Sequence, residues 1–171
     1  TKKNLYFNKD ADLEIIKNKK VGVIGFGNQG RAQALNLIDS GVDVVVAIRN
    51  DSSKKEFLNS KNIKYDNISE VVKNVDLLSI LIPDKIIPDV FNEDILPFLK
   101  EGQTILFSHG YNIYYKLIDV PKNINVIMVA PSGGGKIVRD TFKQGNGVPT
   151  LIAVESDYTG DSLDLAKSYS K

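Results

Sequence analysis

The most constraining feature of this sequence is a glycine-rich turn between a strand-like run and a helix-like run. Residues 20–24 (KVGVI) form the strand candidate, and residues 25–30 (GFGNQG) follow directly as G-x-G-x-x-G. Residues 28–40 then place apolar side chains at the spacing of an amphipathic helix. A strand, a tight turn and a helix in this order predict the first unit of a dinucleotide-binding fold, because the motif is specific in this context.

Each glycine of the turn has its own physical reason in such a fold. Gly25 permits the tight turn, Gly27 lets a diphosphate approach the backbone, and Gly30 lets the helix pack closely on the strand. The helix N-terminus adds free N–H groups and the positive end of its dipole. The alternative is a glycine-rich turn that binds no ligand.

Strand-like and helix-like runs continue to alternate along the rest of the chain. The seven strand candidates are residues 20–24, 42–48, 63–65, 76–82, 104–107, 125–129 and 150–154. The helix candidates are residues 28–40, 52–60, 68–74, 85–91, 95–99 and 160–169. This alternation predicts a Rossmann-type α/β fold with a doubly wound, mostly parallel sheet and helices on both faces. No linker-like stretch divides the sequence, so we expect residues 1–171 to form a single domain.

The end of the second strand candidate indicates which dinucleotide is bound. NAD-binding domains usually carry a carboxylate there for the ribose 2′-hydroxyl, whereas this chain has Arg49, followed by Ser52 and Lys54. Cationic and hydroxyl side chains suit a 2′-phosphate, so we predict NADPH (NADP) as the cofactor. Asp51 argues against this prediction, because a carboxylate beside a phosphate repels it. The alternative is that this segment is only a solvated, charged loop that binds no phosphate.

Composition narrows the remaining classes of function. The 22 basic and 21 acidic side chains leave a net charge of +1, which argues against a nucleic-acid or anionic-membrane surface. The chain has no cysteine and one histidine, so thiolate and poly-histidine metal sites are excluded, and any metal ion would need carboxylates. No apolar run approaches the length of a membrane span, and residues 1–19 lack a signal-peptide core, so we expect a cytoplasmic protein.

Several further segments resemble one enzyme family over essentially the whole chain. They are Tyr6 with residues 8–12 (NKDAD), residues 34–44 (ALNLIDSGVDV), residues 108–113 (SHGYNI), residues 128–131 (MVAP) before a glycine cluster, residues 147–149 (GVP) and residues 152–154 (IAV). In this order they resemble the N-terminal, NADP-binding half of the ketol-acid reductoisomerases. The resemblance is much more specific than the glycine motif alone.

The resemblance implies an activity and a second domain. Enzymes of the family isomerise and reduce 2-acetolactate or 2-aceto-2-hydroxybutyrate, small 2-keto-3-hydroxy acids, in valine and isoleucine synthesis. Magnesium assists the alkyl migration, and NADPH then delivers hydride. The magnesium carboxylates belong to an all-helical, knotted C-terminal domain, which should begin where this sequence ends. The resemblance therefore implies no metal ligand in this chain, and we expect the chain to be inactive by itself.

The resemblance also assigns positions to the cofactor and the active site. The implied cofactor contacts are Phe26, Gly27, Asn28, Gln29, Arg49, Ser52, Asp84, Lys85, Ile86, Ile87 and Gly135. It implies an active-site role for His109, which follows a strand candidate at the carboxyl edge of the sheet, where ligands of open α/β sheets bind. A histidine there could orient a bound hydroxyketone or exchange a proton with it.

Three positions depart from the family pattern. The lysine after "MVAP" is Ser132 here, which supplies no positive charge, and the histidine after the glycine cluster is Lys136. We interpret residues 132–135 as a flexible loop that has lost catalytic constraint. A phosphate-binding serine of the family is Lys54, which preserves the logic of charge.

Three hypotheses follow for the function. The first is the NADPH half of a ketol-acid reductoisomerase that works with a separate helical partner or as a homodimer. The second is a non-catalytic dinucleotide-binding paralogue, suggested by Ser132 and by the missing metal carboxylates. The third is a metal-free reductase of another kind, for which the chain has little room.

Overall fold

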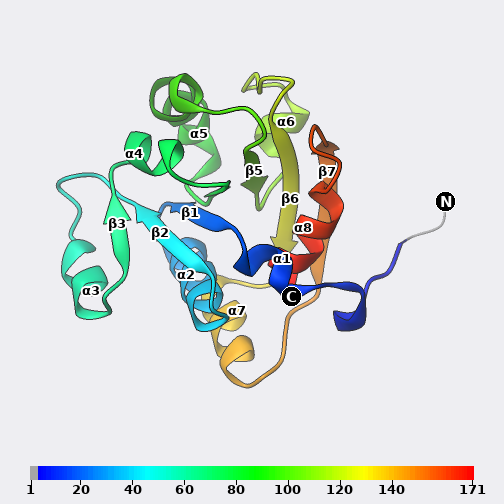
Figure 1. The fold of residues 1–171 in the computed structure, drawn as a ribbon. Helices are drawn as coiled ribbons and strands as arrows, with labels where there is room; N and C mark the ends of the chain where they lie inside the picture. The colour runs from blue at the N-terminus through cyan, green and yellow to red at the C-terminus, as the bar shows by residue number, and fades with distance from the viewer. Residues whose placement is uncertain (1–3) are drawn as a thin grey trace.

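The computed structural model describes residues 4–171, and seven strands of one sheet organise them (Figure 1). The first three residues of the expected domain lie outside the described part. The strands are β1 (Lys20–Ile24), β2 (Asp43–Ala47), β3 (Lys64–Asp66), β4 (Leu77–Ile80), β5 (Thr104–Phe107), β6 (Asn125–Pro131) and β7 (Thr150–Ser156). All seven predicted strands are present, and the boundaries of β1 and β5 are those expected.

The strand order is β3-β2-β1-β4-β5-β6-β7, with β1 to β6 parallel and β7 antiparallel to β6. The chain therefore runs outward from β1 to β3 and restarts on the other side at β4. Between β1 and β4 the direction of winding reverses, which creates a crevice outside the carboxyl ends of these two strands. The predicted doubly wound, mostly parallel sheet is confirmed.

Helices and helical turns cover both faces of the sheet (Figure 1). The α-helices are α1 (Leu13–Lys17), α2 (Asn28–Asp39), α3 (Lys55–Ser60), α4 (Ile68–Lys73), α5 (Ile87–Val90), α6 (Tyr111–Tyr114), α7 (Gly135–Lys143) and α8 (Ser162–Ser170). The shorter turns are η1 (Asn8–Asp10), η2 (Asp84–Ile86), the π-helical η3 (Phe91–Ile95) and η4 (Leu96–Phe98). Helices at residues 85–91 and 95–99 were predicted, and this stretch instead divides into η2, α5, η3 and η4.

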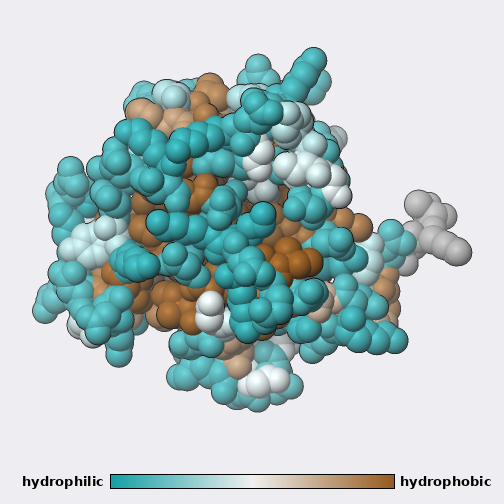
Figure 2. Space-filling model, viewed as in Figure 1, coloured by the Kyte–Doolittle hydropathy of each residue, from teal (hydrophilic) through white to brown (hydrophobic). Residues whose placement is uncertain are grey.

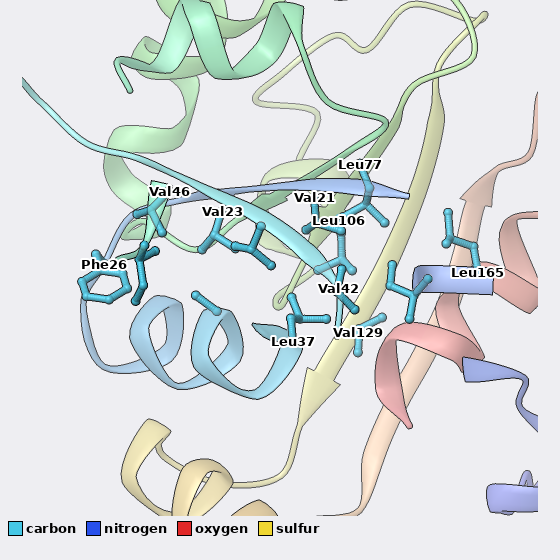
Figure 3. Packing of buried hydrophobic residues seen from close by; sticks show 14 of the residues in the cluster. Val21, Val23, Phe26, Leu37, Val42, Val46, Leu77, Leu106, Val129 and Leu165 are labelled. Carbon is cyan, nitrogen blue, oxygen red and sulfur yellow. The ribbon is translucent and has the colours of Figure 1, made fainter. Parts of the chain in front are cut away.

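Two apolar clusters hold the layers together. One cluster joins Ile16 of α1, Leu37 of α2, Leu58 of α3 and Leu165 of α8 to side chains of the sheet. Figure 3 shows Leu37 and Leu165 in this cluster beside Val21, Val23 and Leu106. The other cluster joins side chains of α4, α5 and η3 to the sheet. The central strands contribute to both clusters, so β4 and β5 are buried along their whole length. Continuous apolar runs in the sequence predict strands of this doubly covered kind.

The visible surface in Figure 2 is mostly hydrophilic, and apolar side chains show between the polar ones near its centre. In the part of the chain that the structure describes, no helix is both long enough and apolar enough to span a bilayer.

The largest difference from the sequence analysis concerns residues 132–143. The glycine cluster was interpreted as a flexible loop, but Gly134 caps a nine-residue helix that begins at Gly135. This helix, α7, packs alongside α2 (Figure 1). Arg139 holds the two helices together, because its guanidinium reaches Asp39 at 2.6 Å and the side-chain oxygen of Asn36 at 2.8 Å.

The N-termini of α2 and α7 approach one another so closely that one position must lack a side chain. A Cβ atom at Gly135 would lie 2.0 Å from the backbone oxygen of Asn28, whereas a Cβ atom at Gly134 would have no neighbour within 4 Å. Gly135 therefore allows α7 to start against the first turn of α2.

We predict that Gly135→Ala lowers the free energy of unfolding by about 2 to 3 kcal/mol, because the new methyl group overlaps backbone that cannot rotate away. Gly134→Ala is the matched control, because it adds the same methyl group into open space. Urea denaturation followed by circular dichroism measures both variants. Equal stability of the two variants would contradict the close approach.

Candidate functional site: the crevice at the carboxyl ends of β1, β4 and β5

The glycine turn joins β1 to α2 at the point where the winding of the sheet reverses. Gly25 has a φ of +96°, which a residue with a side chain rarely adopts. A Cβ atom at Gly30 would lie 2.1 Å from the Gly25 carbonyl oxygen, so only glycine allows α2 to start this close to β1. The roles predicted for the first and third glycines agree with this geometry.

The second glycine faces open space. Gly27 is the N-cap of α2, and a Cβ atom there would meet nothing within 4 Å. It provides no side chain to cap the first-turn N–H groups of the 12-residue helix, so these groups are available to an anion. A cradle of this shape fits the diphosphate of a dinucleotide.

The loop between β2 and α3 places the predicted 2′-phosphate residues at the carboxyl end of β2. Arg49 and Lys54 are exposed, and among the described residues neither forms an ion pair. The backbone N–H of Ser52 donates to the Arg49 carbonyl at 3.0 Å, and the Ser52 hydroxyl accepts from the Lys54 N–H at 3.2 Å. The loop is therefore a hydrogen-bonded turn with two free cations, and Asp51 is exposed beside them.

Sequence reasoning missed a third cation beside this loop. The Arg31 guanidinium lies over the Phe57 ring, 4.0 Å from its centroid, and Phe57 contacts Phe26 at a centroid separation of 5.9 Å. Phe26 is buried, so this aromatic pair connects the glycine turn to α3 and supports the arginine. Arg31 directly follows Gly30, and this position next to the motif was the available signal.

Residues 84–87, which follow β4, were predicted to contact the cofactor, and they differ in exposure. Asp84, Lys85 and Ile86 form η2, and the Asp84 carboxylate is partly exposed. The Ile87 side chain is buried in the core at 3% exposure. A ligand in front of the sheet would therefore reach Ile87 mainly along one edge of its side chain or through its backbone.

His109 follows β5 and is mostly exposed, with 69% of its side chain accessible. Its Nδ1 atom accepts the backbone N–H of Tyr111 at 3.2 Å. A neutral His109 therefore carries its proton on Nε2, which can donate to a ligand oxygen. The Asp84 carboxylate lies 3.7 Å from Nδ1, which is too far for a hydrogen bond.

A cavity of about 130 Å³ brings these segments together. The residues around it are Gln29, Ile80, Leu81, Ile82, Asp84, Ile87, Phe107, Ser108 and His109. Members of the glycine turn, of the segment after β4 and of the segment after β5 therefore share one hollow. A larger, polar cavity of about 480 Å³ lies at the opposite edge of the sheet and contains none of the predicted site residues.

The glycine cluster at residues 133–135, which includes the predicted contact Gly135, packs against the first turn of α2 and does not line the cavity that contains His109. The Gln29 side-chain amide donates to the Gly133 carbonyl at 2.7 Å, and Gly135 contacts the backbone of Asn28. Lys136 points away, because its ammonium group pairs with Asp140 at 2.6 Å and its side chain is 90% exposed. Lys136 therefore does not supply the positive charge that Ser132 lacks.

A divalent metal ion has no ready place among these residues. Within residues 4–171, no three histidine or carboxylate side chains are grouped closely enough to hold one. The residues that the structure describes therefore fit a dinucleotide and do not by themselves fit magnesium.

Comparison with known proteins identifies the family. Residues 15–171 match the family model described as the NADPH-binding domain of acetohydroxy acid isomeroreductase. Two ketol-acid reductoisomerases (NADP(+)), from Methanocaldococcus jannaschii and Methanothermobacter thermautotrophicus, are each 46% identical to the chain over 167 residues. Each match covers 98% of this chain and 51% of the relative, so the chain spans about half the length of these relatives.

Solved structures agree with this assignment. An NADH-preferring ketol-acid reductoisomerase from an uncultured archean matches with a TM-score of 0.90 and 35% identity, covering 95% of this chain and 50% of that one. A 1-pyrroline-5-carboxylate reductase from Streptococcus pyogenes matches with a TM-score of 0.65 and 15% identity over 90% of this chain and 56% of that one, which shows the shared fold alone. The chain belongs to the ketol-acid reductoisomerase family, and residues 15–171 are its NADPH-binding domain.

Proposed function

We propose that this chain binds NADPH across the crevice and serves as the NADPH-binding half of an enzyme that isomerises and reduces 2-acetolactate or 2-aceto-2-hydroxybutyrate. The cavity that joins Gln29, Asp84 and His109 carries this proposal, because it connects the glycine turn to the single histidine of the chain. Both core clusters pack on one sheet, which supports our expectation that residues 1–171 form a single domain.

The bound dinucleotide has a defined direction in this proposal. Its adenosine end lies at the carboxyl end of β2, where Arg49, Ser52 and Lys54 face a 2′-phosphate and Arg31 adds positive charge. Its diphosphate lies over the glycine turn. Its nicotinamide end therefore extends past Gln29 toward the carboxyl ends of β4 and β5. NADPH, when bound there, supplies the hydride for the reduction.

His109 binds and orients the substrate in this proposal. Its Nε2–H donates to an oxygen of the hydroxyketone, because Nδ1 is occupied by the backbone N–H of Tyr111.

A second candidate function is dinucleotide binding without isomerisation. Ser132 provides no cation, and Lys136 is engaged with Asp140 on the surface of α7. Under this alternative the chain binds NADPH as tightly as an enzyme would, but the hydroxyketone finds no positive charge near the glycine cluster.

We predict that the purified chain binds NADPH at least about tenfold more tightly than NADH, because each charge-assisted contact to the 2′-phosphate contributes roughly 1.5 to 3 kcal/mol. Arg49→Ala should weaken NADPH binding and leave NADH binding unchanged. Titration with fluorescence detection of the reduced nicotinamide measures both affinities.

Lys122→Ala is the matched control for this titration, because it removes one exposed cation from the opposite edge of the sheet. Its affinities for both cofactors should equal those of the unchanged chain. Equal affinity of the unchanged chain for NADPH and NADH would refute the assignment of the 2′-phosphate site. Lack of binding to either cofactor would refute the proposed function as a whole.

We predict that a hybrid of this chain with the unmatched half of the Methanocaldococcus jannaschii relative consumes NADPH when 2-acetolactate and magnesium are present. In that hybrid, His109→Ala should lower kcat at least about a hundredfold, as expected for loss of an acid–base group, and retain NADPH binding. Absorbance at the reduced-nicotinamide band follows the reaction. A hybrid that binds NADPH without turnover, and gains turnover through Ser132→Lys, would favour the second candidate.

A further inference from the structure

A directed chain of side-chain hydrogen bonds crosses the interior from the sheet to the glycine cluster. The Tyr169 hydroxyl of α8 lies 2.9 Å from the Ser79 hydroxyl of β4 and donates to the side-chain oxygen of Gln33 at 2.7 Å. The Gln33 amide donates to the side-chain oxygen of Gln29 at 3.0 Å. The Gln29 amide donates to the Gly133 carbonyl at 2.7 Å.

Ser79, Gln33 and the Tyr169 hydroxyl meet in the interior, where a polar atom without a partner costs the most free energy. Ser79 is fully buried, and Gln33 is 6% exposed. The Tyr169 hydroxyl lies inside the protein between these two side chains, and burial raises the pKa of this hydroxyl. It therefore remains protonated at physiological pH and keeps its ability to donate. Removing one member would leave a buried polar atom without a partner.

The direction of the chain follows from its last acceptor. The Gly133 carbonyl can only accept, so the Gln29 amide group must face it and the Gln29 oxygen must face Gln33. The Gln33 amide then faces Gln29, and its oxygen must face Tyr169. Tyr169 consequently donates to Gln33, and its own oxygen accepts from Ser79. A reversal at any link would place two acceptors or two donors against each other.

The hydrogen-bonded chain ends at the cofactor site, whereas Tyr169 lies outside that site. Gln29 lines the cavity that contains His109, and Gly133 precedes the start of α7, which rests on the backbone of Asn28. Tyr169 is outside that cavity and is linked to it through Gln33, whose amide donates to Gln29 at 3.0 Å and to the Ser108 hydroxyl of the cavity at 3.4 Å. The hydrogen-bonded chain therefore connects α8 to the side-chain orientation of Gln29 in the first turn of α2.

We propose that Tyr169 is a positioning residue for the nicotinamide half of the cofactor, holding Gln29 and residues 132–135 in place through Gln33; this rests on the proposed function. The adenosine half lies beyond β1 at the β2–α3 loop, which the hydrogen-bonded chain does not touch. Tyr169 thus affects one half of the binding site and leaves the other unchanged.

The test compares two ligands on the purified chain. Tyr169→Phe removes one hydroxyl, and we expect it to weaken NADPH binding by about tenfold, the effect of leaving one buried acceptor unpaired. Binding of adenosine 2′-phosphate, which lacks both the diphosphate and the nicotinamide half, should stay unchanged. Isothermal titration calorimetry measures both ligands, and a melting curve of each variant measures its stability.

Tyr158→Phe is the matched control, because the Tyr158 hydroxyl bonds Glu101 at the opposite edge of the sheet. It should bind both ligands as the unchanged chain does. A merely structural role of Tyr169 would lower the melting temperature and weaken both ligands together, which would overturn the proposal. Unchanged NADPH binding in Tyr169→Phe would also overturn it. Failure of the unchanged chain to bind NADPH would instead refute the proposed function.

A second variant keeps the test decisive if Tyr169→Phe does not fold. Gln33→Glu has nearly the same shape, but its carboxylate presents only acceptors and turns the Gln29 amide away from Gly133. We expect the same selective loss of NADPH affinity with this variant. Affinity of Gln33→Glu for NADPH equal to that of the unchanged chain would contradict the chain of hydrogen bonds as the positioning device.

Discussion

The cofactor site depends on how closely the first turn of α2 approaches two other pieces of backbone. Gly30 brings the turn against the Gly25 carbonyl, and Gly135 brings the start of α7 against Asn28. At both glycines an added Cβ atom would overlap the neighbouring backbone. These two close approaches therefore fix the direction in which the N-terminus of α2 points. The turn after β1 lies between the loop that carries Arg49 and Lys54 and the segment that carries His109 in the order of the strands. One extended ligand over this turn could therefore contact both in the proposed site.

The accuracy of prediction from sequence followed the physical origin of each element. The strands β4 and β5 are buried on both faces, so they read as uninterrupted apolar runs and were found. The helix α7 was missed because two glycines precede it, a third glycine begins it and its sequence is rich in charge. Pro88 and Pro97 signalled interruption correctly, but they could not indicate that a π-helical turn would connect the pieces.

The candidate site also has a part that the sequence predicts and a part that it does not. A phosphate-binding turn is local, so its glycines predict it, and the Gly25 and Gly30 geometry has the expected form. The partnership of Arg31 with Phe57 and that of Gln33 with Tyr169 join residues far apart in the chain. Neither pair follows from spacing or composition, because each depends on how α2 packs against α3 or α8. Such contacts require the packed structure.

In the proposed site, cofactor affinity and cofactor selectivity have separate physical sources. We propose that selectivity resides in exposed cations and a hydroxyl on the short turn after β2, which can change without disturbing the core. The contacts proposed for the common part of the cofactor depend instead on close backbone packing and on the hydrogen-bonded chain, which tolerate little change. The proposed separation is consistent with a family that contains proteins named for NADP(+) and an NADH-preferring member whose structure matches this chain with a TM-score of 0.90. The loop after β2 can diverge while the turn, α7 and α8 keep their shared geometry.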